Sequence, residues 1–286
     1  MTVSKRAATT LGCAITLCAG LAQADGHSVG DDVIASQRAA LAESTAGAGF
    51  GPQSPRDLDT ATGNNTVFFN TAPPHNQMNL CNIHFHESAE HRGGEFTTYA
   101  GNGDGKGAGT GFLYDGALTE AELAPLGRSI GEGTYGSLEP GDTIELHYVH
   151  STAKITPGPT LGSCLSDNLM NPQLRVETQV FVLVNDDTAA DFVTLTAVEE
   201  VEGFHQAVNI PTDTGTPIEY DGSTTGPSFN EAGSPLQVSW SVRPEVMKVS
   251  ITSVEAWLAD NIFDETSAHG VRNLVTNPDL ISSIGQ

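Results

Sequence analysis

The sequence of 286 residues predicts a mainly β protein of the α+β class, built as one domain with short helices at its periphery. Only 16% of the residues are charged while 31 are glycine, a composition closer to a sheet protein with many turns than to a helical bundle. Short runs rich in Val, Ile, Thr, Phe and Tyr recur along the chain, and Gly, Pro, Asn or Asp bounds each of them. Only one segment has a convincing helical pattern.

The first 24 residues have the pattern of a cleaved secretory signal. Two basic residues precede an apolar run from Leu11 to Leu21, and the segment closes on Ala-Gln-Ala. That run is shorter than the roughly 20 residues that cross a bilayer, so a membrane anchor fits less well; a buried N-terminal helix is the alternative. We therefore expect a mature protein that starts near Asp25 and is periplasmic or secreted.

Export bears on the four cysteines. Cys13 and Cys18 lie in the signal segment, so Cys81 and Cys164 remain as one pair in an oxidising compartment. A bridge between them would close a long loop and contribute roughly 4 to 5 kcal/mol on the chain-entropy model. Two buried free thiols are the alternative.

The remaining chain is strongly acidic, with 35 acidic against 12 basic residues and a formal charge of -23. Nucleic acid and anionic lipid are polyanions that need a basic surface, so neither is an expected partner. Residues 25–60 form an expected N-terminal arm with a short helical stretch around Ile34 to Ala46. Residues 61–286 form the expected main domain.

Seven segments after the arm have strand patterns. They are Thr66–Asn70, Leu80–His86, Thr143–Ser151, Leu174–Val184, Val193–Val198, Leu236–Val242 and Met247–Ile251. Among them lies "GNGDGKGAGTG", residues 101–111, which resembles a calcium loop only loosely through Asp104 and is expected to be a flexible surface loop.

The one convincing helix follows the last strand. Thr252 and Glu255 have the spacing of a capping box. Val254, Trp257, Leu258 and Ile262 fall on one face, which predicts packing against the sheet.

Histidines cluster on two of the predicted strands. In "CNIHFHESAEH", residues 81–91, strand periodicity places Asn82, His84 and His86 on one face. Cys81, Ile83, Phe85 and Glu87 would point to the other face. In "TIELHYVHS", residues 143–151, Glu145 and His147 share a face. Pairing the two strands would bring three imidazoles together.

Three neutral imidazoles supply three of the four tetrahedral positions of a catalytic zinc ion and leave the fourth to water. The metal lowers the pKa of that water from about 15.7 to roughly 7. Each strand also offers a partner for the far nitrogen of a ring, Asn82 for His84 and Glu145 for His147. Coincidental core or surface histidines are the alternative to a metal site.

These residues resemble the carbonic anhydrases of the α class and of the related δ class. "HFHESAEH" is similar to the first two zinc ligands and the acidic relay residue, and "ELHYVH" to the strand with the third ligand. The threonine segment in residues 220–242 and "HGVRNLV", residues 269–275, follow in the same order as in that family. The resemblance spans roughly residues 65–275 and implies a large, mostly antiparallel twisted sheet with the histidine strands near its centre.

The resemblance implies a zinc lyase that hydrates carbon dioxide reversibly to bicarbonate through metal-bound hydroxide. His84, His86 and His147 would hold the metal. A threonine of the pair Thr224 and Thr225 would accept the hydrogen bond of the hydroxide, and Glu90 would accept from that threonine.

Departures from the α-class pattern favour the δ class. "GSTTGP" is one residue shorter than the α-class segment and has Gly226 for its first proline, so the gatekeeping threonine stays undecided. The glycine-rich insertion and Cys81 ahead of the histidine strand are more δ-like. For the proton shuttle His75 is the candidate, against a solvated loop histidine, while His91 and His150 are expected to pack or hydrogen bond.

Two alternatives compete with this function. In a cupin-type metalloenzyme, a dioxygenase or isomerase on a β-barrel, Glu90 would join the three histidines as a ligand of iron, manganese or nickel. That reading expects glycine where the chain has Thr97, and it leaves the threonine segment unexplained. The other alternative is a non-catalytic zinc-binding module on the same fold.

Overall fold

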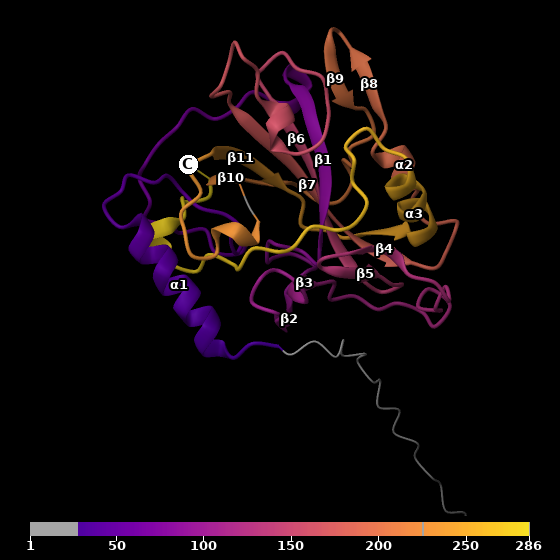
Figure 1. The fold of residues 1–286 in the computed structure, drawn as a ribbon. Helices are drawn as coiled ribbons and strands as arrows, with labels where there is room; N and C mark the ends of the chain where they lie inside the picture. The colour runs from indigo at the N-terminus through magenta and orange to yellow at the C-terminus, as the bar shows by residue number, and fades with distance from the viewer. Residues whose placement is uncertain (1–27, 225, 286) are drawn as a thin grey trace, which may run out of the picture.

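The computed structural model describes residues 28–224 and 226–285. Six strands form one twisted, mixed sheet in which β1, β6, β7, β11 and β10 lie side by side in that order and β12 also pairs with β7 (Figure 1). The β1–β6, β6–β7 and β10–β11 pairs are antiparallel, and β7 pairs in parallel with β11 and β12. The strands are β1 Asn79–Glu87, β6 Thr143–Ser151, β7 Leu174–Val184, β10 Ile218–Ser223, β11 Gln237–Val242 and β12 Met247–Ser250.

Three small hairpins and several short helices surround this sheet. The hairpins pair β2 Thr98–Asn102 with β3 Thr110–Leu113, β4 Ile130–Gly133 with β5 Gly136–Leu138, and β8 Val198–Val201 with β9 Phe204–Ala207. The α-helices are α1 Asp31–Thr45, α2 Phe192–Leu195 and α3 Ile251–Ala259, and the 3₁₀ helices are His75–Gln77, Leu161–Cys164, Pro227–Phe229 and Pro278–Leu280. The predicted mainly β fold with short helices is thereby confirmed. The domain boundaries at residues 24 and 60 stay a prediction.

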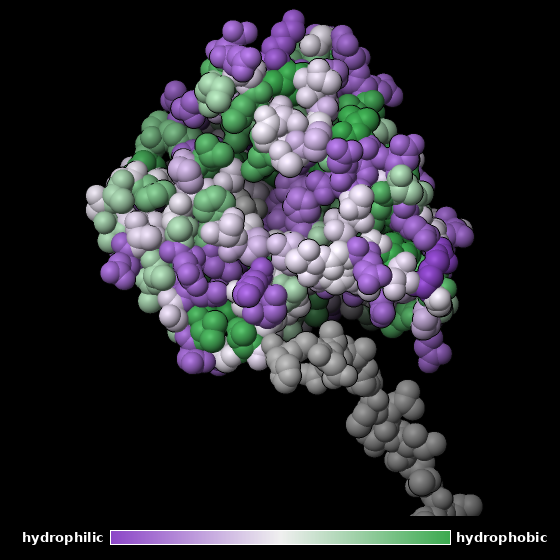
Figure 2. Space-filling model, viewed as in Figure 1, coloured by the Kyte–Doolittle hydropathy of each residue, from purple (hydrophilic) through white to green (hydrophobic). Residues whose placement is uncertain are grey.

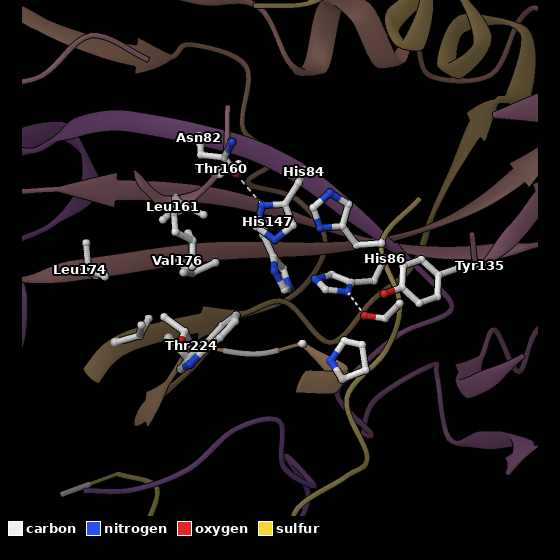
Figure 3. A pocket seen from close by; sticks show the side chains of 17 residues that line it. Asn82, His84, His86, Tyr135, His147, Thr160, Leu161, Leu174, Val176 and Thr224 are labelled. Carbon is white, nitrogen blue, oxygen red and sulfur yellow. Dashed lines mark hydrogen bonds between the residues drawn. The ribbon is translucent and has the colours of Figure 1, made fainter. Parts of the chain in front are cut away.

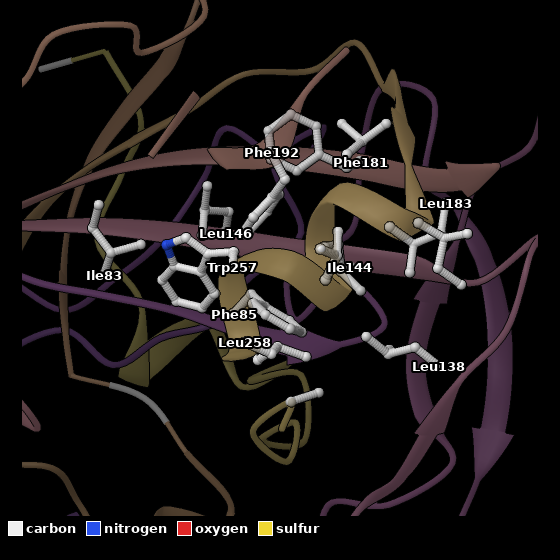
Figure 4. Packing of buried hydrophobic residues seen from close by; sticks show 14 of the residues in the cluster. Ile83, Phe85, Leu138, Ile144, Leu146, Phe181, Leu183, Phe192, Trp257 and Leu258 are labelled. Atoms are coloured by element: carbon white, nitrogen blue, oxygen red, sulfur yellow. The ribbon is translucent and has the colours of Figure 1, made fainter. Parts of the chain in front are cut away.

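The central sheet buries apolar side chains on both of its faces. On one face Phe85, Leu146 and Phe181 pack against Trp257 and Leu258 of α3 (Figure 4). On the other face a second cluster includes Val149, Val176 and Trp240. His84 and His86 of β1 and His147 of β6 lie on this second face, so the first cluster packs behind the part of the sheet that carries them.

A β-bulge in β1 alters the predicted alternation at Cys81. The register with β6 shifts between Leu80 and Asn82, so Leu80 and Ile83 pack in the same cluster although they are three residues apart. Cys81 therefore joins the cluster of Val149 on the second face, and the prediction that it points with Ile83 is wrong. The sulfur of Cys81 is bonded to that of Cys164, which confirms the predicted disulfide.

Removing this disulfide should destabilise the fold strongly. The bridge joins residues 83 positions apart, so on the chain-entropy model its loss costs roughly 4 to 5 kcal/mol. For a domain of this size that corresponds to a fall of about 10 °C in the melting temperature. We expect this fall for the double variant Cys81→Ala/Cys164→Ala in thermal unfolding, and no further fall when a reductant is added to it. Equal melting temperatures for the variant and the oxidised wild type would contradict the expectation.

Two of the seven predicted strands are wrong. Residues 66–70 have no regular secondary structure, although the other expected strand regions contain β1, β6, β7, β11 and β12. Residues 192–195 form the short helix α2, because the side chain of Asp191 accepts a hydrogen bond from the backbone N–H of Thr194 at 2.6 Å and Phe192 is fully buried. Tertiary packing overrides the strand propensity of this segment.

The predicted helix is present as α3, but its predicted cap is not. Ser250 is the N-cap residue and its side chain makes no capping hydrogen bond. Thr252 instead donates to Asp187, and the carboxylate of Glu255 pairs with Arg128. Val254, Trp257 and Leu258 are buried as expected, whereas Ile262 lies beyond the end of the helix and is 56% exposed.

The N-terminal arm and the glycine-rich loop pack against each other and against the C-terminal region. Leu41 of α1 is buried with Val275, Leu280 and Ile281. Gln37 donates to the carbonyl of Gly105 at 2.8 Å. Gly107 is buried, and a Cβ there would lie 3.2 Å from the Cα of Gly270. The loop is thus packed into the molecule rather than being only a flexible surface loop.

The predicted signal segment, residues 1–24, lies outside the described residues.

One contribution to stability should fall as the pH rises towards neutrality, that of the carboxyl group of Asp142 ahead of β6. Burial raises the pKa of Asp142 to about 6, although the backbone N–H of Glu139 donates to this carboxylate at 2.7 Å. Its pKa in the folded state thus exceeds the unfolded value of about 3.9, so the contribution of this group to stability is lost as the pH rises from about 4 through about 6. Asp142→Asn removes this loss and should raise the free energy of unfolding by about 1 to 2 kcal/mol above pH 7.

Urea unfolding from pH 4 to pH 8 measures this effect. The exposed Asp213→Asn is the control for the loss of one negative charge from a very acidic chain. Parallel pH profiles for Asp142→Asn and the wild type would contradict the prediction.

Candidate metal centre

Two adjacent antiparallel strands bring three histidine rings together. His84 of β1 lies directly opposite His147 of β6, and His86 lies two residues further along β1 on the same face. The ring centroids are 5.1 Å apart for His84 and His147, 5.2 Å for His84 and His86, and 4.7 Å for His86 and His147. One nitrogen of each ring lies within 4.8 Å of the corresponding nitrogens of the other two. In Figure 3 the three rings point toward one another.

The second nitrogen of each ring has a hydrogen-bond partner. Nδ1 of His84 lies 2.6 Å from Oδ1 of Asn82, and Nε2 of His147 lies 2.7 Å from Oε1 of Glu145. Nδ1 of His86 donates to the backbone carbonyl of Gly270 at 2.9 Å. These bonds fix the tautomers and leave Nε2 of His84, Nε2 of His86 and Nδ1 of His147 as lone-pair donors. Nε2 of His86 is buried without a hydrogen-bond partner, as expected of an atom that binds a metal.

The protein holds these rings in the neutral form. Burial, with a smaller contribution from the neighbouring His269, lowers the pKa of His86 to about 3. Burial is likewise the largest cause of the lowered pKa values of His84 and His147. Neutral imidazoles at physiological pH are the form that binds metal, so the site is prepared for a cation without first having to lose protons.

A buried hydrogen-bonded chain supports the third ring from behind. Oε1 of Glu145 is shared between His147 and Nδ1 of His91, both at 2.7 Å, and Oε2 accepts from the backbone N–H of His91 at 3.0 Å. Nε2 of His91 lies 2.7 Å from the hydroxyl of Tyr220, which donates to Ser54. Burial acts to raise the pKa of Glu145, but the charge of His91 and the hydrogen bonds from both histidines hold it well below its usual value. Glu145 therefore stays a carboxylate at the centre of the protein.

The rings face a cavity of about 280 Å³ that has a polar side and an apolar side. Figure 2 shows this face of the molecule hollowed near its centre, with hydrophilic residues inside the hollow and hydrophobic residues along part of its rim. The apolar lining of the cavity consists of Val149, Leu161, Leu174, Val176, Val238 and Trp240, and Figure 3 shows Leu161, Leu174 and Val176 beside the rings. The cavity thus joins a floor of three histidines that could hold a metal ion to a surface suited to a small apolar molecule.

The other predicted site residues divide into those near the rings and those away from them. Glu90 is fully buried, and its Oε1 accepts from the backbone N–H of Arg272 at 2.8 Å. Its Oε1 lies 3.6 Å from Nδ1 of His86, on the side of that ring turned away from the other two rings. Thr224 lines the cavity and its hydroxyl lies 2.5 Å from that of Ser234, whereas Thr225 lies outside the described residues.

His75 has a different environment from the one predicted. Its ring lies beside His150, at 5.5 Å between centroids, and its Nδ1 is 3.4 Å from Oε1 of Glu177. Both neighbours are on the face of the sheet opposite the three rings. His75 does not line the cavity, so the geometry does not support the predicted proton-shuttle role.

Sequence reasoning missed two contributions and left the partner of a third unnamed. His91 was expected to pack or hydrogen bond and it does so, but its partner Glu145 lies on a distant strand. Gly270 acts through its carbonyl, which no side-chain pattern reveals. His269 also lines the cavity. Its presence in "HGVRNLV" was the available signal, since a histidine beside a segment that resembles a known family is a candidate for the site.

A mixed β-sheet that presents three buried, neutral imidazoles to a half-apolar cavity is an arrangement that could hold a metal ion, and it is typical of metalloenzymes with three histidine ligands. A family model described as "Delta carbonic anhydrase" matches residues 75–253, more than half of the chain. The chain belongs to the delta carbonic anhydrase family and is a carbonic anhydrase. The open sheet and this match leave the cupin alternative without support.

Solved structures that resemble the chain include three carbonic anhydrases. The α-carbonic anhydrase from Thermovibrio ammonificans with the inhibitor sulfanilamide has 14% identity and a TM-score of 0.27, over 78% of this chain and 84% of that one. The Photobacterium profundum α-carbonic anhydrase has 15% identity and a TM-score of 0.27, over 87% and 97%. A hyperthermostable carbonic anhydrase from an active hydrothermal vent chimney has 15% identity and a TM-score of 0.28, over 79% and 85%. Curated proteins give no match.

Proposed function

We propose that the chain catalyses the reversible hydration of carbon dioxide to bicarbonate with a zinc ion held by His84, His86 and His147. One observation carries the proposal: three buried rings converge at the floor of a cavity, and the far nitrogen of each ring is already hydrogen bonded. Three nitrogen ligands with no carboxylate among them suit zinc better than the harder cations. Zinc, when bound, leaves one coordination position for water and lowers the pKa of that water to about 7.

The residues around the rings perform the remaining tasks. Hydrogen bonds to Asn82, Gly270 and Glu145 keep each of the three histidine rings in the tautomer whose lone pair faces the cavity. The apolar wall, with Val149, Val176 and Trp240, provides a dry surface for carbon dioxide beside the reacting water. Carbon dioxide is small and carries no charge. Contact with the apolar wall can therefore position it, and no charged side chain is needed for this.

Glu90 and a threonine would orient the reacting water. A carboxylate only accepts hydrogen bonds, so a threonine hydroxyl bonded to Glu90 must donate to it. The hydroxyl has then used its only proton, so it can only accept a hydrogen bond from the reacting water. The water thereby keeps a lone pair directed at carbon dioxide. Thr224 and Thr225 are the candidates for this position, and Thr224→Val and Thr225→Val distinguish them by which one lowers kcat.

We further propose that the protein acts outside the cytoplasm. The Cys81–Cys164 disulfide is of a kind that persists in oxidising compartments. Cleavage of the predicted signal before Asp25 can be read from the N-terminus of the exported protein by mass spectrometry. No helix in the described ranges, 28–224 and 226–285, is long and apolar enough to cross a bilayer.

Stopped-flow hydration of carbon dioxide by the purified mature protein tests the proposed function. The expected result is activity that is lost when a chelator removes the metal, returns with added zinc, and is inhibited by a sulfonamide. A wild-type protein that is fully loaded with zinc and inactive would favour the non-catalytic zinc-binding module instead. Redox-active iron at the site would contradict the proposal that these histidines bind zinc.

A further inference from the structure

A fourth histidine, His269, stands beside the metal centre in a segment without helix or strand. Its backbone N–H donates to the carbonyl of Phe85 at 2.8 Å, and its carbonyl accepts from the N–H of Glu87 at 3.0 Å. These two bonds flank His86 on β1, so the backbone of His269 is fixed to the strand that carries two of the proposed ligands. The position of its side chain is therefore set by the fold.

The ring of His269 covers one face of His84. The two ring centroids are 4.9 Å apart and the ring planes differ by only 23°, which is a stacked arrangement. His86 and His147 meet His84 differently, edge to face, at 69° and 81°. Of the four histidines in this group, His269 is the one that stacks on His84.

A buried carboxylate fixes the orientation of His269. Nε2 of His269 lies 2.7 Å from Oε2 of Glu265, a residue that is only 8% exposed. The backbone of Glu265 is held by the side chain of Asn261. The N–H of Glu265 donates to Oδ1 of Asn261 at 3.1 Å, and its carbonyl accepts from Nδ2 of Asn261 at 2.8 Å. A chain of hydrogen bonds thus runs from Asn261 through Glu265 to His269, whose ring stacks on His84.

The ring of His84 needs such a support. The torsion that turns a histidine ring about its Cβ–Cγ bond has broad minima, so the rotamer alone does not fix the ring plane. Asn82 holds one edge of the ring at Nδ1. The hydrogen bond alone still allows the ring of His84 to rotate about that edge. The contact of His269 with the face of the ring restrains this rotation.

We propose that His269, oriented by Glu265, is a positioning residue for the metal centre: its stacked ring keeps Nε2 of His84 directed at the point where the three imidazoles converge. The inference rests on the proposed function only in that a metal binds at this point. It assigns His269 no contact with substrate and no transfer of a proton.

The test measures metal affinity and ligand geometry in the full mature chain. Zinc affinity is obtained by competition with a chromophoric chelator, and the geometry at the metal by the visible absorption spectrum of the cobalt-loaded protein. The variants are His269→Ala, which removes the ring, and His269→Phe, which keeps a stacking ring but loses the bond to Glu265. His205→Ala, a half-buried histidine of β9 away from the cavity, is the matched control.

His269→Ala is expected to weaken zinc binding by roughly 10- to 100-fold, as loss of an outer partner of a ligand does, and to shift the cobalt spectrum. His269→Phe should recover most of the affinity and the wild-type spectrum, and His205→Ala should match the wild type. Wild-type affinity and spectrum in His269→Ala would overturn the inference. Equal losses in His269→Phe and His269→Ala would also overturn it, because the ring contact would then not be what matters.

The two proposals fail in distinguishable ways. If the wild type binds no zinc at His84, His86 and His147, the proposed function fails. If the wild type binds zinc and hydrates carbon dioxide while His269→Ala keeps full affinity and an unchanged spectrum, only the positioning role fails.

Discussion

Replacing His147 with alanine is expected to abolish both metal binding and the hydration of carbon dioxide. His147 supplies one of three nitrogens that converge at the site, and two remaining imidazoles cannot complete the coordination that zinc requires. The loss of affinity should exceed the roughly 10- to 100-fold that loss of an outer partner costs. Metal content by plasma emission spectroscopy and the rate of hydration by stopped flow measure the two effects on the same sample.

His150→Ala is the matched control. His150 is on the same strand, three residues from His147, and is also fully buried, but it lies on the opposite face of the sheet. Any general loss of packing in β6 should affect both variants alike. A His150→Ala protein that loses its metal, or a His147→Ala protein that keeps it, would contradict the assignment of His147 as a ligand.

Glu90→Gln is expected to retain the metal and lose most of the rate. The substitution conserves shape and keeps an oxygen that can accept from the N–H of Arg272. It replaces the other acceptor with an amide that donates, so a threonine hydroxyl bonded there is no longer forced to donate to residue 90. Disturbing one preorganised hydrogen bond of this kind costs about 10²- to 10³-fold in kcat.

Glu87→Gln is the control for this second variant. Glu87 is also on β1 and is one residue from His86, but it does not line the cavity. We expect Glu87→Gln to keep the wild-type kcat and Glu90→Gln to show normal zinc content with a reduced kcat. Loss of zinc in Glu90→Gln would instead assign Glu90 to the metal, as the cupin reading required.

Strand periodicity was sufficient to predict how the three histidines come together. β1 and β6 are long and buried along almost their whole length, so the facing directions of their histidines follow from strand alternation, although the bulge at Cys81 interrupts that alternation at the start of β1. The spacing of two residues then places Asn82 beside His84 and Glu145 beside His147, and both hydrogen bonds are present.

The partners that come from outside these strands could not be predicted in the same way. Gly270 contributes a backbone carbonyl and His269 a stacked ring, and both come from a segment without a periodic pattern; Gly270 is 184 residues from His86 in the sequence. His91 reaches Glu145 only through the tertiary fold. Contacts of this kind depend on how distant segments pack, and a single sequence carries no local record of them.

Errors in the secondary structure have the same origin. Residues 192–195 have strand propensity but form α2, because Asp191 caps the segment and Phe192 fills a space in the core. The capping box at Thr252 and Glu255 had the right spacing, yet Asp187 and Arg128 from other segments bind those side chains. Local signals were overridden wherever a stronger tertiary partner was available.

A crystal structure of the zinc-loaded protein with data collected on both sides of the zinc absorption edge gives the most direct test. We expect a single strong anomalous peak about 2.0 to 2.1 Å from Nε2 of His84, Nε2 of His86 and Nδ1 of His147. A peak bound elsewhere, or any of the three rings turned away from the peak, would contradict the proposed metal centre.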